Sequence, residues 1–187
     1  TVHVPFERDG QGYVLIDTAG VRRRARVSDT VEKFSIVKTL QAIDEAHVVV
    51  GVLDAHDTVA EQDASLLGLV VEQGRALVIA VNKWDGIPSD QRQAIRDGVD
   101  LRLDFPRFAP VHFNSAGHGT GVGELMTAVR AAYRAAMREL PTQELTRALE
   151  QAVGVHQPPL VRGRRIKLRY AHQGGRNPPI VVIHGNQ

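Results

Sequence analysis

The chain has 187 residues, 43% of them apolar and 24% charged, which is ordinary for a globular protein and enough for a sizeable core. It has no cysteine, which excludes disulfides and thiolate metal sites and favours a reducing compartment, the cytoplasm. No apolar run approaches the roughly 18 residues of a membrane span, and no signal peptide opens the sequence.

The net charge of +2 is unevenly distributed. Residues 1–140 carry 16 Lys or Arg against 19 Asp or Glu, whereas residues 141–187 carry 7 against 2. A basic segment after an acidic body indicates either a polyanionic partner for that segment or a solvated basic surface, and charge alone leaves both open.

Strands alternate with helices through most of the chain. The predicted elements are strands at 1–7 and 13–17, a helix at 31–46, a strand at 47–54, a helix between Thr58 and Gly74, a strand at 75–83, a helix at 88–103, a strand at 109–115 and a helix at 121–140. Asp9-Gly10 favours a hairpin turn, Thr58 and Glu61 have capping-box spacing, and 47–54 is expected to be covered on both faces. The alternation predicts an α/β fold with a mainly parallel sheet between helices.

The pattern changes at Pro141. Thr142 is expected to cap a helix that ends at Val153, and residues 164–172 and 180–185 read as two strands joined by a turn. We therefore place a domain boundary here and expect domains at 1–140 and 141–187.

Basic residues alternate with apolar ones in this second domain, so Arg165, Lys167 and Arg169 are expected to share one face of a strand. That face could bind phosphates in a salt-sensitive manner. It could equally protect a sheet edge from pairing or dock on the acidic body.

Three polar clusters follow predicted strands of the first domain: "DTAG" at 17–20, "NKWD" at 82–85 and "NSAG" at 114–117. Ligands of open α/β sheets bind outside the carboxyl ends of the strands. We expect the three clusters to converge on one edge of the sheet.

The clusters offer groups that suit a guanine nucleotide. The Asp85 carboxylate can accept two parallel hydrogen bonds, which matches the N1–H and 2-amino group of guanine, whereas adenine lacks this donor pair. Asn82 can tie the loops together, the Lys83 stem can lie across the base, and the Ala116 N–H can donate to O6. Asp17 can hold Mg²⁺ through water, and the Gly20 N–H can approach a γ-phosphate.

These motifs differ in specificity. D-x-x-G is expected about once by chance in a chain of this length, whereas N-K-x-D is expected on the order of once per fifty such chains. Asp17 alone could be a helix cap, but both motifs in order, each after an apolar strand, make coincidence a poor explanation.

Long stretches of the chain resemble the Der (EngA) GTPase family: "DTAGVRRRARVSDTVEKFSIVKTLQAI", "VNKWDG", "HFNSAGHGTGVGEL" and "HQPPLVRGRRIKLRYAH" with "NPPIVVIHGNQ". The resemblance implies the second G domain, a Ras-like P-loop three-layer sandwich, followed by part of a KH-like domain. It also implies a bacterial, cytoplasmic GTPase with two tandem G domains that acts in assembly of the large ribosomal subunit. Its partners would be GTP or GDP, ribosomal RNA and the first G domain, and no membrane.

The resemblance also implies a set of nucleotide-binding residues. They are Asp17, Thr18, Ala19, Gly20, Val21, Asn82, Lys83, Trp84, Asp85, Ser115 and Ala116, with Asp17 serving Mg²⁺. Trp84 fills the free position of N-K-x-D, and we interpret it mainly as packing near the base loop.

The sequence departs from a complete GTPase in two ways. The phosphate loop G-x-x-x-x-G-K-[ST] does not occur in these residues, and in the family it lies upstream, on a central strand expected beside 13–17 and 48–54. Val21 stands where many GTPases place a water-orienting Gln, and the resemblance implies that hydrolysis uses K⁺, whose ligand would be in that loop. The sequence therefore identifies no catalytic residue, and these 187 residues alone are expected to hydrolyse GTP weakly or not at all.

The arginines that follow the first cluster have more than one interpretation. Arg22, Arg23, Arg24 and Arg26 could stabilise phosphate charge, dock on RNA or another domain, or lie in a solvated switch loop. No G-x-x-G loop, with which KH domains grip nucleic acid, occurs in 141–187. The alternative to a GTPase switch is a nucleotide-independent module that binds RNA or another domain.

Overall fold

The structure is a computed structural model that describes residues 2–18, 29–105, 108–161 and 163–186. It divides into two compact units, Thr1–Ala132 and Tyr133–Gln187. None of its helices, within these ranges, is long and apolar enough to cross a membrane.

The chain opens with an antiparallel hairpin. Strands β1 (Val2–Arg8) and β2 (Gln11–Asp17) pair along their whole length. Asp9 and Gly10 have φ values of 53° and 71°, the left-handed conformation that a type I′ turn requires at both central residues. The predicted hairpin is confirmed.

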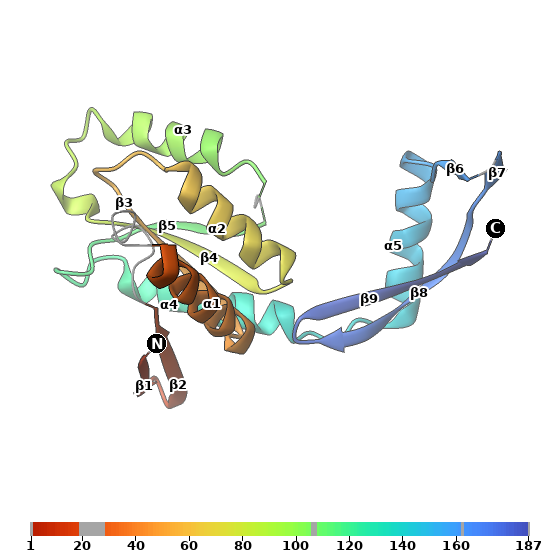
Figure 1. Cartoon of the computed structure of the whole chain (residues 1–187), viewed down its shortest axis with the longest axis horizontal. Helices are drawn as coiled ribbons and strands as arrows, with labels where there is room; N and C mark the ends of the chain where they lie inside the picture. The colour runs from red at the N-terminus through yellow and green to blue at the C-terminus, as the bar shows by residue number, and fades with distance from the viewer. Residues whose placement is uncertain (1, 19–28, 106–107, 162, 187) are drawn as a thin grey trace. The chain divides into compact units, whose positions relative to one another are not determined.

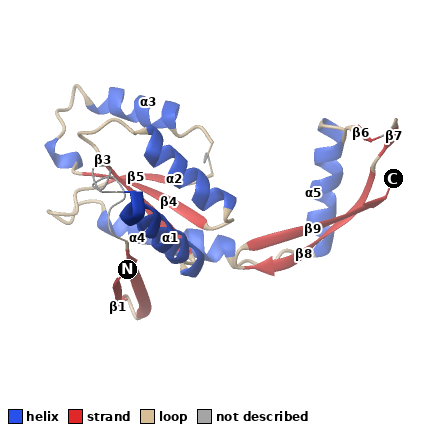
Figure 2. Ribbon diagram, in the orientation of Figure 1, coloured by secondary structure: helices blue, strands red, loops and turns tan. Residues whose placement is uncertain are grey.

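A parallel three-stranded sheet forms the centre of the first unit. Its strands are β3 (Val48–Asp54), β4 (Ala76–Asn82) and β5 (Val111–Phe113), in the order β3-β4-β5. The helices that alternate with them are α1 (Asp29–Glu45), α2 (Glu61–Glu72), α3 (Arg92–Arg102) and α4 (Val122–Ala136). Figure 1 shows α2 and α3 on one side of this sheet and α4 on the other. Helices and strands alternate along this unit, as Figure 2 shows, which confirms the predicted α/β class.

The core is built around β4, whose apolar run is buried on both faces as an inner parallel strand requires. Leu77, Ile79 and Val81 pack with side chains from α1, α2 and α3, while Val78 and Ala80 between them point to the opposite face and are also buried.

The prediction that 47–54 is covered on both faces is wrong. Val50 is 36% and Val52 65% exposed, although Leu53 is buried. The reason is that β3 lies at an edge: among the described strands it pairs only with β4, and β2 pairs only with β1. The hairpin and the parallel sheet are therefore separate sheets.

Helix starts also differ from the prediction. The N-cap of α2 is Ala60, whose N–H donates to the Asp63 carboxylate at 3.0 Å, so the predicted capping box of Thr58 and Glu61 is wrong. Gly74, with φ of 68°, ends this helix as predicted. The next helix begins at Arg92, one turn later than expected.

The second unit pairs one helix with a long ribbon. It contains α5 (Thr142–Val155), the short strands β6 (Leu160–Val161) and β7 (Arg164–Arg165), and the antiparallel ribbon of β8 (Lys167–Arg176) and β9 (Pro179–Asn186). The predicted turn shrinks to Asn177 and Pro178, and Pro141 rather than Thr142 is the N-cap of the helix.

The single strand that was predicted to carry Arg165, Lys167 and Arg169 on one face is interrupted. Ile166 separates β7 from β8, and the register shifts between Leu168 and Tyr170, so Arg169 is an extra residue in a β-bulge. A bulge re-aims the side chains around it and breaks the alternation on which the prediction relied.

Candidate nucleotide-binding site

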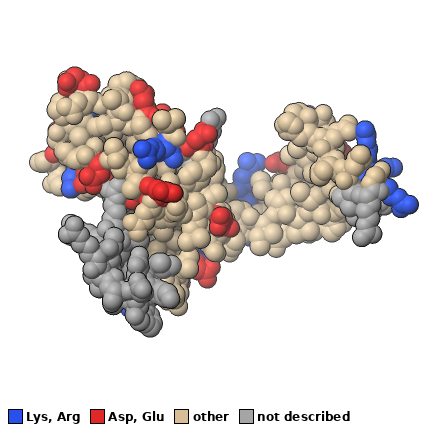
Figure 3. All heavy atoms as spheres, turned by 45° about the horizontal axis from the view of Figure 1, so that its top comes forward, with Lys and Arg blue, Asp and Glu red and all other residues tan. Residues whose placement is uncertain are grey.

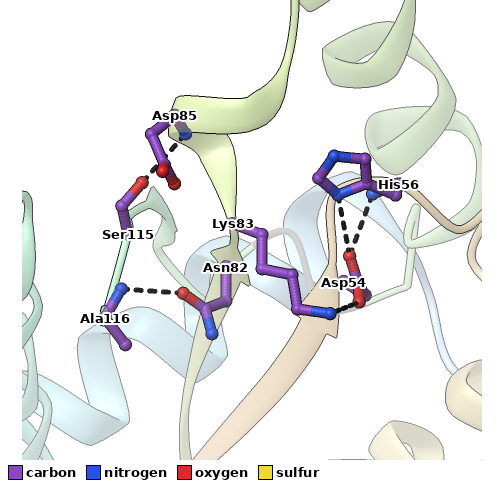
Figure 4. A network of polar contacts seen from close by, with 7 residues as sticks. All are labelled: Asp54, His56, Asn82, Lys83, Asp85, Ser115 and Ala116. Atoms are coloured by element: carbon purple, nitrogen blue, oxygen red, sulfur yellow. Dashed lines mark hydrogen bonds and ion pairs between the residues drawn. The ribbon is translucent and has the colours of Figure 1, made fainter. Parts of the chain in front are cut away.

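Two of the three polar clusters meet where β4 and β5 end. Asn82 Oδ1 accepts a hydrogen bond from the Ala116 N–H at 2.9 Å, and the Asp85 N–H donates to Ser115 Oγ at 2.9 Å (Figure 4). The Trp84 N–H also donates to the Asn114 carbonyl at 3.1 Å. These three bonds lock the loops at 82–85 and 114–117 together.

The Asp85 carboxylate lies at the surface of this paired loop. Its side chain is 45% exposed, and its Oδ2 is 2.8 Å from Nδ1 of His118. The Ser115 hydroxyl, with a further effect from His118, lowers the pKa of the Asp85 carboxyl. An ionised carboxylate only accepts hydrogen bonds, so this group suits a partner with two adjacent donors.

The Ala116 N–H is already engaged. The sequence predicts that this N–H donates to guanine O6, but in the structure it donates to Asn82 Oδ1. A carbonyl oxygen at that position would have to share this bond or replace it.

Lys83 is held by Asp54, a residue outside the three polar clusters. Its φ is 64°, and its Nζ is 2.5 Å from Asp54 Oδ2, while Asp54 Oδ1 accepts the His56 N–H at 3.0 Å (Figure 4). Lys83 is the main cause that lowers the pKa of Asp54 to about 2. The available signal was that Asp54, like Asn82, ends an apolar strand, and the two stand opposite each other in the β3–β4 register.

Trp84 packs as expected of the free position in N-K-x-D. It lies in a one-turn helix, η2 (Trp84–Gly86), with its ring centroid 4.4 Å from that of Phe113. The guanidinium of Arg96 lies over both rings, at 5.1 Å from the Trp84 centroid and 4.1 Å from the Phe113 centroid. These cation–π contacts stabilise the loop that carries Trp84.

The third cluster is only partly described. Asp17 is exposed at the end of β2, and Thr18 follows it. Ala19, Gly20 and Val21 lie outside the described residues, and so do the four arginines at 22–24 and 26 whose roles were left open above. The described contacts do not join Asp17 to the Asn82 loop, because β2 belongs to a separate sheet.

An exposed carboxylate of this kind fits Mg²⁺. That ion keeps several waters and takes one or two carboxylates together with substrate phosphates, rather than a protein cage. Among the described residues, no group of three or more histidine, cysteine or acidic side chains could hold a metal ion.

Two family profiles match the chain. One, described as a 50S ribosome-binding GTPase, covers residues 1–83, and the other, described as the KH-domain-like C-terminal region of EngA bacterial GTPase enzymes, covers residues 139–187.

Curated relatives match the whole chain. GTPase Der of Thioalkalivibrio sulfidiphilus is 63% identical over 186 residues, which is 100% of this chain and 40% of the relative. GTPase Der of Halorhodospira halophila is 63% identical over 187 residues with the same coverage, and that of Escherichia coli O9:H4 is 57% identical, with 38% of its length covered. The chain thus spans about two-fifths of the length of these relatives.

Solved structures support the Ras-like P-loop fold. Era in complex with MgGDPNP and nucleotides 1506–1542 of 16S ribosomal RNA has a TM-score of 0.60 and 18% identity, over 98% of this chain and 64% of that one. The elongation factor SelB of Methanococcus maripaludis, in complex with a GTP analogue, has a TM-score of 0.57 and 15% identity, over 75% of this chain and 29% of that one.

Proposed function

We propose that this chain, which belongs to the Der (EngA) GTPase family, supplies the guanine-recognition part of a GTP-hydrolysing switch that acts in assembly of the large ribosomal subunit. Residues 1–140 would be most of the second of two tandem G domains, and 141–187 the start of the KH-like domain. The protein would work in the cytoplasm.

The observation that carries this proposal is the position of the Asp85 carboxylate. It is exposed and held ionised at the end of a parallel sheet, on a loop fixed by Asn82 and Ser115. The guanine edge would donate its N1–H and 2-amino group to Asp85 in place of His118, and the Lys83 stem would cover the base.

The phosphate side of the site involves other parts of the protein. Asp17 would hold Mg²⁺ through water, and Thr18, Ala19, Gly20 and Val21 would follow the γ-phosphate as a switch segment that GTP orders and hydrolysis releases. The phosphate loop and a K⁺ ligand would come from the preceding segment that the relatives' greater length accommodates. Ribosomal RNA and the first G domain would be its partners.

Titration of fluorescent GDP into a protein of the relatives' full length tests guanine recognition. We expect micromolar or tighter binding that Asp85→Asn abolishes, because the amide can no longer accept two hydrogen bonds. Asp90→Asn, which removes an exposed carboxylate outside the site, is the matched control. Equal competition by inosine, xanthosine and guanosine nucleotides would contradict the assignment.

The second candidate function is that of a nucleotide-independent binding platform. Two observations favour it: the hairpin forms a sheet of its own, and one edge of β3 pairs with no described strand. It predicts that the full-length protein binds no GDP, whereas the switch predicts GDP binding that Asp85→Asn abolishes.

A further inference from the structure

A cluster of three aromatic rings lies on the β8–β9 ribbon of the second unit. Tyr170 and His184 face each other across the strands with ring centroids 4.3 Å apart and planes 8° from parallel. His172 joins them at 5.0 Å from His184, and His184 Nε2 is 3.1 Å from His172 Nδ1. These three residues are called the ring cluster below.

The ring cluster occupies one face of the ribbon. Ala171, between Tyr170 and His172, is buried, and its N–H donates to Thr146 Oγ1 of α5 at 3.2 Å, so this helix lies along the edge of β8. Because successive side chains of a strand alternate, Tyr170 and His172 project on the face opposite to the Ala171 side chain. Tyr170 is 43% exposed, so one end of the cluster is open to solvent.

Cations without a described acidic partner lie beside the rings. Arg138 and Arg176 pair with Glu144 and Glu139, but Arg164, Arg165 and Lys167 are exposed and make no ion pair with any described residue. Figure 3 shows Lys and Arg atoms gathered at the end of this unit that carries β7 and the start of β8. Lys167 and Tyr170 pair with Asn186 and His184, which are two residues apart, so at about 3.3 Å per residue Lys167 lies roughly 7 Å along the ribbon from Tyr170.

We infer that the ring cluster and this basic end bind a single-stranded nucleic-acid segment, with an unpaired base stacked on Tyr170 and the adjoining phosphates on Lys167 and Arg165. Stacked aromatic rings accept any base through its flat face, and neighbouring cations neutralise the backbone. Two acidic residues against seven basic ones in 141–187 favour a polyanion over an acidic or neutral partner.

This site differs from the grip of KH domains, which needs a G-x-x-G loop that 141–187 lack. It deepens the RNA-binding part of the proposed function and does not depend on the nucleotide part. Asp85→Asn should therefore leave oligonucleotide affinity unchanged, and ring-cluster variants should leave GDP affinity unchanged.

Fluorescence anisotropy with unstructured 12-nucleotide RNA and DNA probes, at 50 and 200 mM salt, tests the inference in the full-length protein. Tyr170→Ala should weaken binding roughly 5- to 100-fold, while Tyr170→Phe, which keeps the ring, should bind like the wild type. Tyr133→Ala is the matched control, because that tyrosine is 41% exposed but lies outside the cluster. Lys167→Ala should weaken binding to all sequences and reduce the salt slope by about one.

Tyr170→Leu keeps the apolar bulk on the ribbon without the ring, so it tests the inference even if the alanine variant fails to fold. A Leu variant that binds as tightly as the wild type, a Phe variant as weak as the Leu variant, or a wild type that binds neither probe at 50 mM salt would each overturn the inference. The ratio of RNA to DNA affinity decides which nucleic acid is the ligand.

Discussion

Asp54 positions Lys83 through a short ion pair, and this pair makes stability depend on pH. The pKa of Asp54 falls from its ordinary 3.8 to about 2, first because of Lys83 and then because of the His56 N–H. A carboxyl with a depressed pKa in the folded state stabilises the protein above pH 3.8, and this contribution is lost as the pH falls from 3.8 to 2.

Asp54→Asn tests this linkage. The side chain is 27% exposed, so solvent screening reduces the full linkage value, and we expect a loss of about 1 kcal/mol in the free energy of unfolding at pH 7. The difference from wild type should shrink towards zero near pH 2. Urea unfolding followed by the fluorescence of Trp84, the single tryptophan of the chain, measures it. Asp90→Asn serves as the control, and a difference that stays constant down to pH 2.5 would refute the linkage.

Single residues of the candidate site were predictable only where a motif names them. N-K-x-D predicts Asn82, Lys83 and Asp85 as site residues, because the spacing of the motif carries the chemistry. No motif names Asp54 or His118, because their contacts with Lys83 and Asp85 form only in the tertiary structure. For Asp54 the one available signal was its place at the end of an apolar strand. The role of Ala116 stays a prediction, because its N–H has a competing acceptor, Asn82 Oδ1, within the protein.

Among the elements, α2 shows how a local signal can mislead. Two pairs of residues here have the three-residue spacing of a capping box: Thr58 with Glu61, and Ala60 with Asp63. Sequence preference favours the first pair, because threonine is the better N-cap. The structure uses the second, in which the Asp63 carboxylate accepts the Ala60 N–H at 3.0 Å.

Asp63→Ala should therefore destabilise the protein by about 1 kcal/mol, since it removes both an N-terminal hydrogen bond and a favourable charge at the start of the helix. Glu61→Ala, a control at the exposed first position of the same helix, should change stability by only a few tenths of a kcal/mol. Urea unfolding of both variants decides between the two caps. A larger loss of stability in Glu61→Ala than in Asp63→Ala would support the predicted capping box of Thr58 and Glu61.

Other element-level errors share a cause. The alternation of basic and apolar residues along 164–172 predicted one regular strand. The bulge at Arg169 depends on how β8 pairs with β9, which the period-two pattern of one strand does not contain. Strand and helix types were predicted correctly because each depends on many residues, whereas caps, bulges and turn lengths depend on one or two.

For the whole molecule, the alternation of strands and helices predicted the fold class, but exposure depends on which strands are neighbours. Val14 and Leu15 on β2 and Val50 and Val52 on β3 are exposed, and the second edges of these two strands are unpaired in the described structure. A further parallel strand between them would satisfy both backbone edges and would bring a crossover helix to cover one face of β3.

In a protein of the relatives' full length, we therefore expect Val52 to be buried although it is 65% exposed here. Val52→Asp should then destabilise that protein by about 3 kcal/mol or more, because it buries a charge without a partner. Leu101, 80% exposed on α3, is the matched control, and Leu101→Asp should change stability by less than about 0.5 kcal/mol. Urea midpoints of the two variants compare these sites directly. Equally small shifts would mean that no strand lies beside β3, and the second candidate function, a platform that works without nucleotide, would gain support.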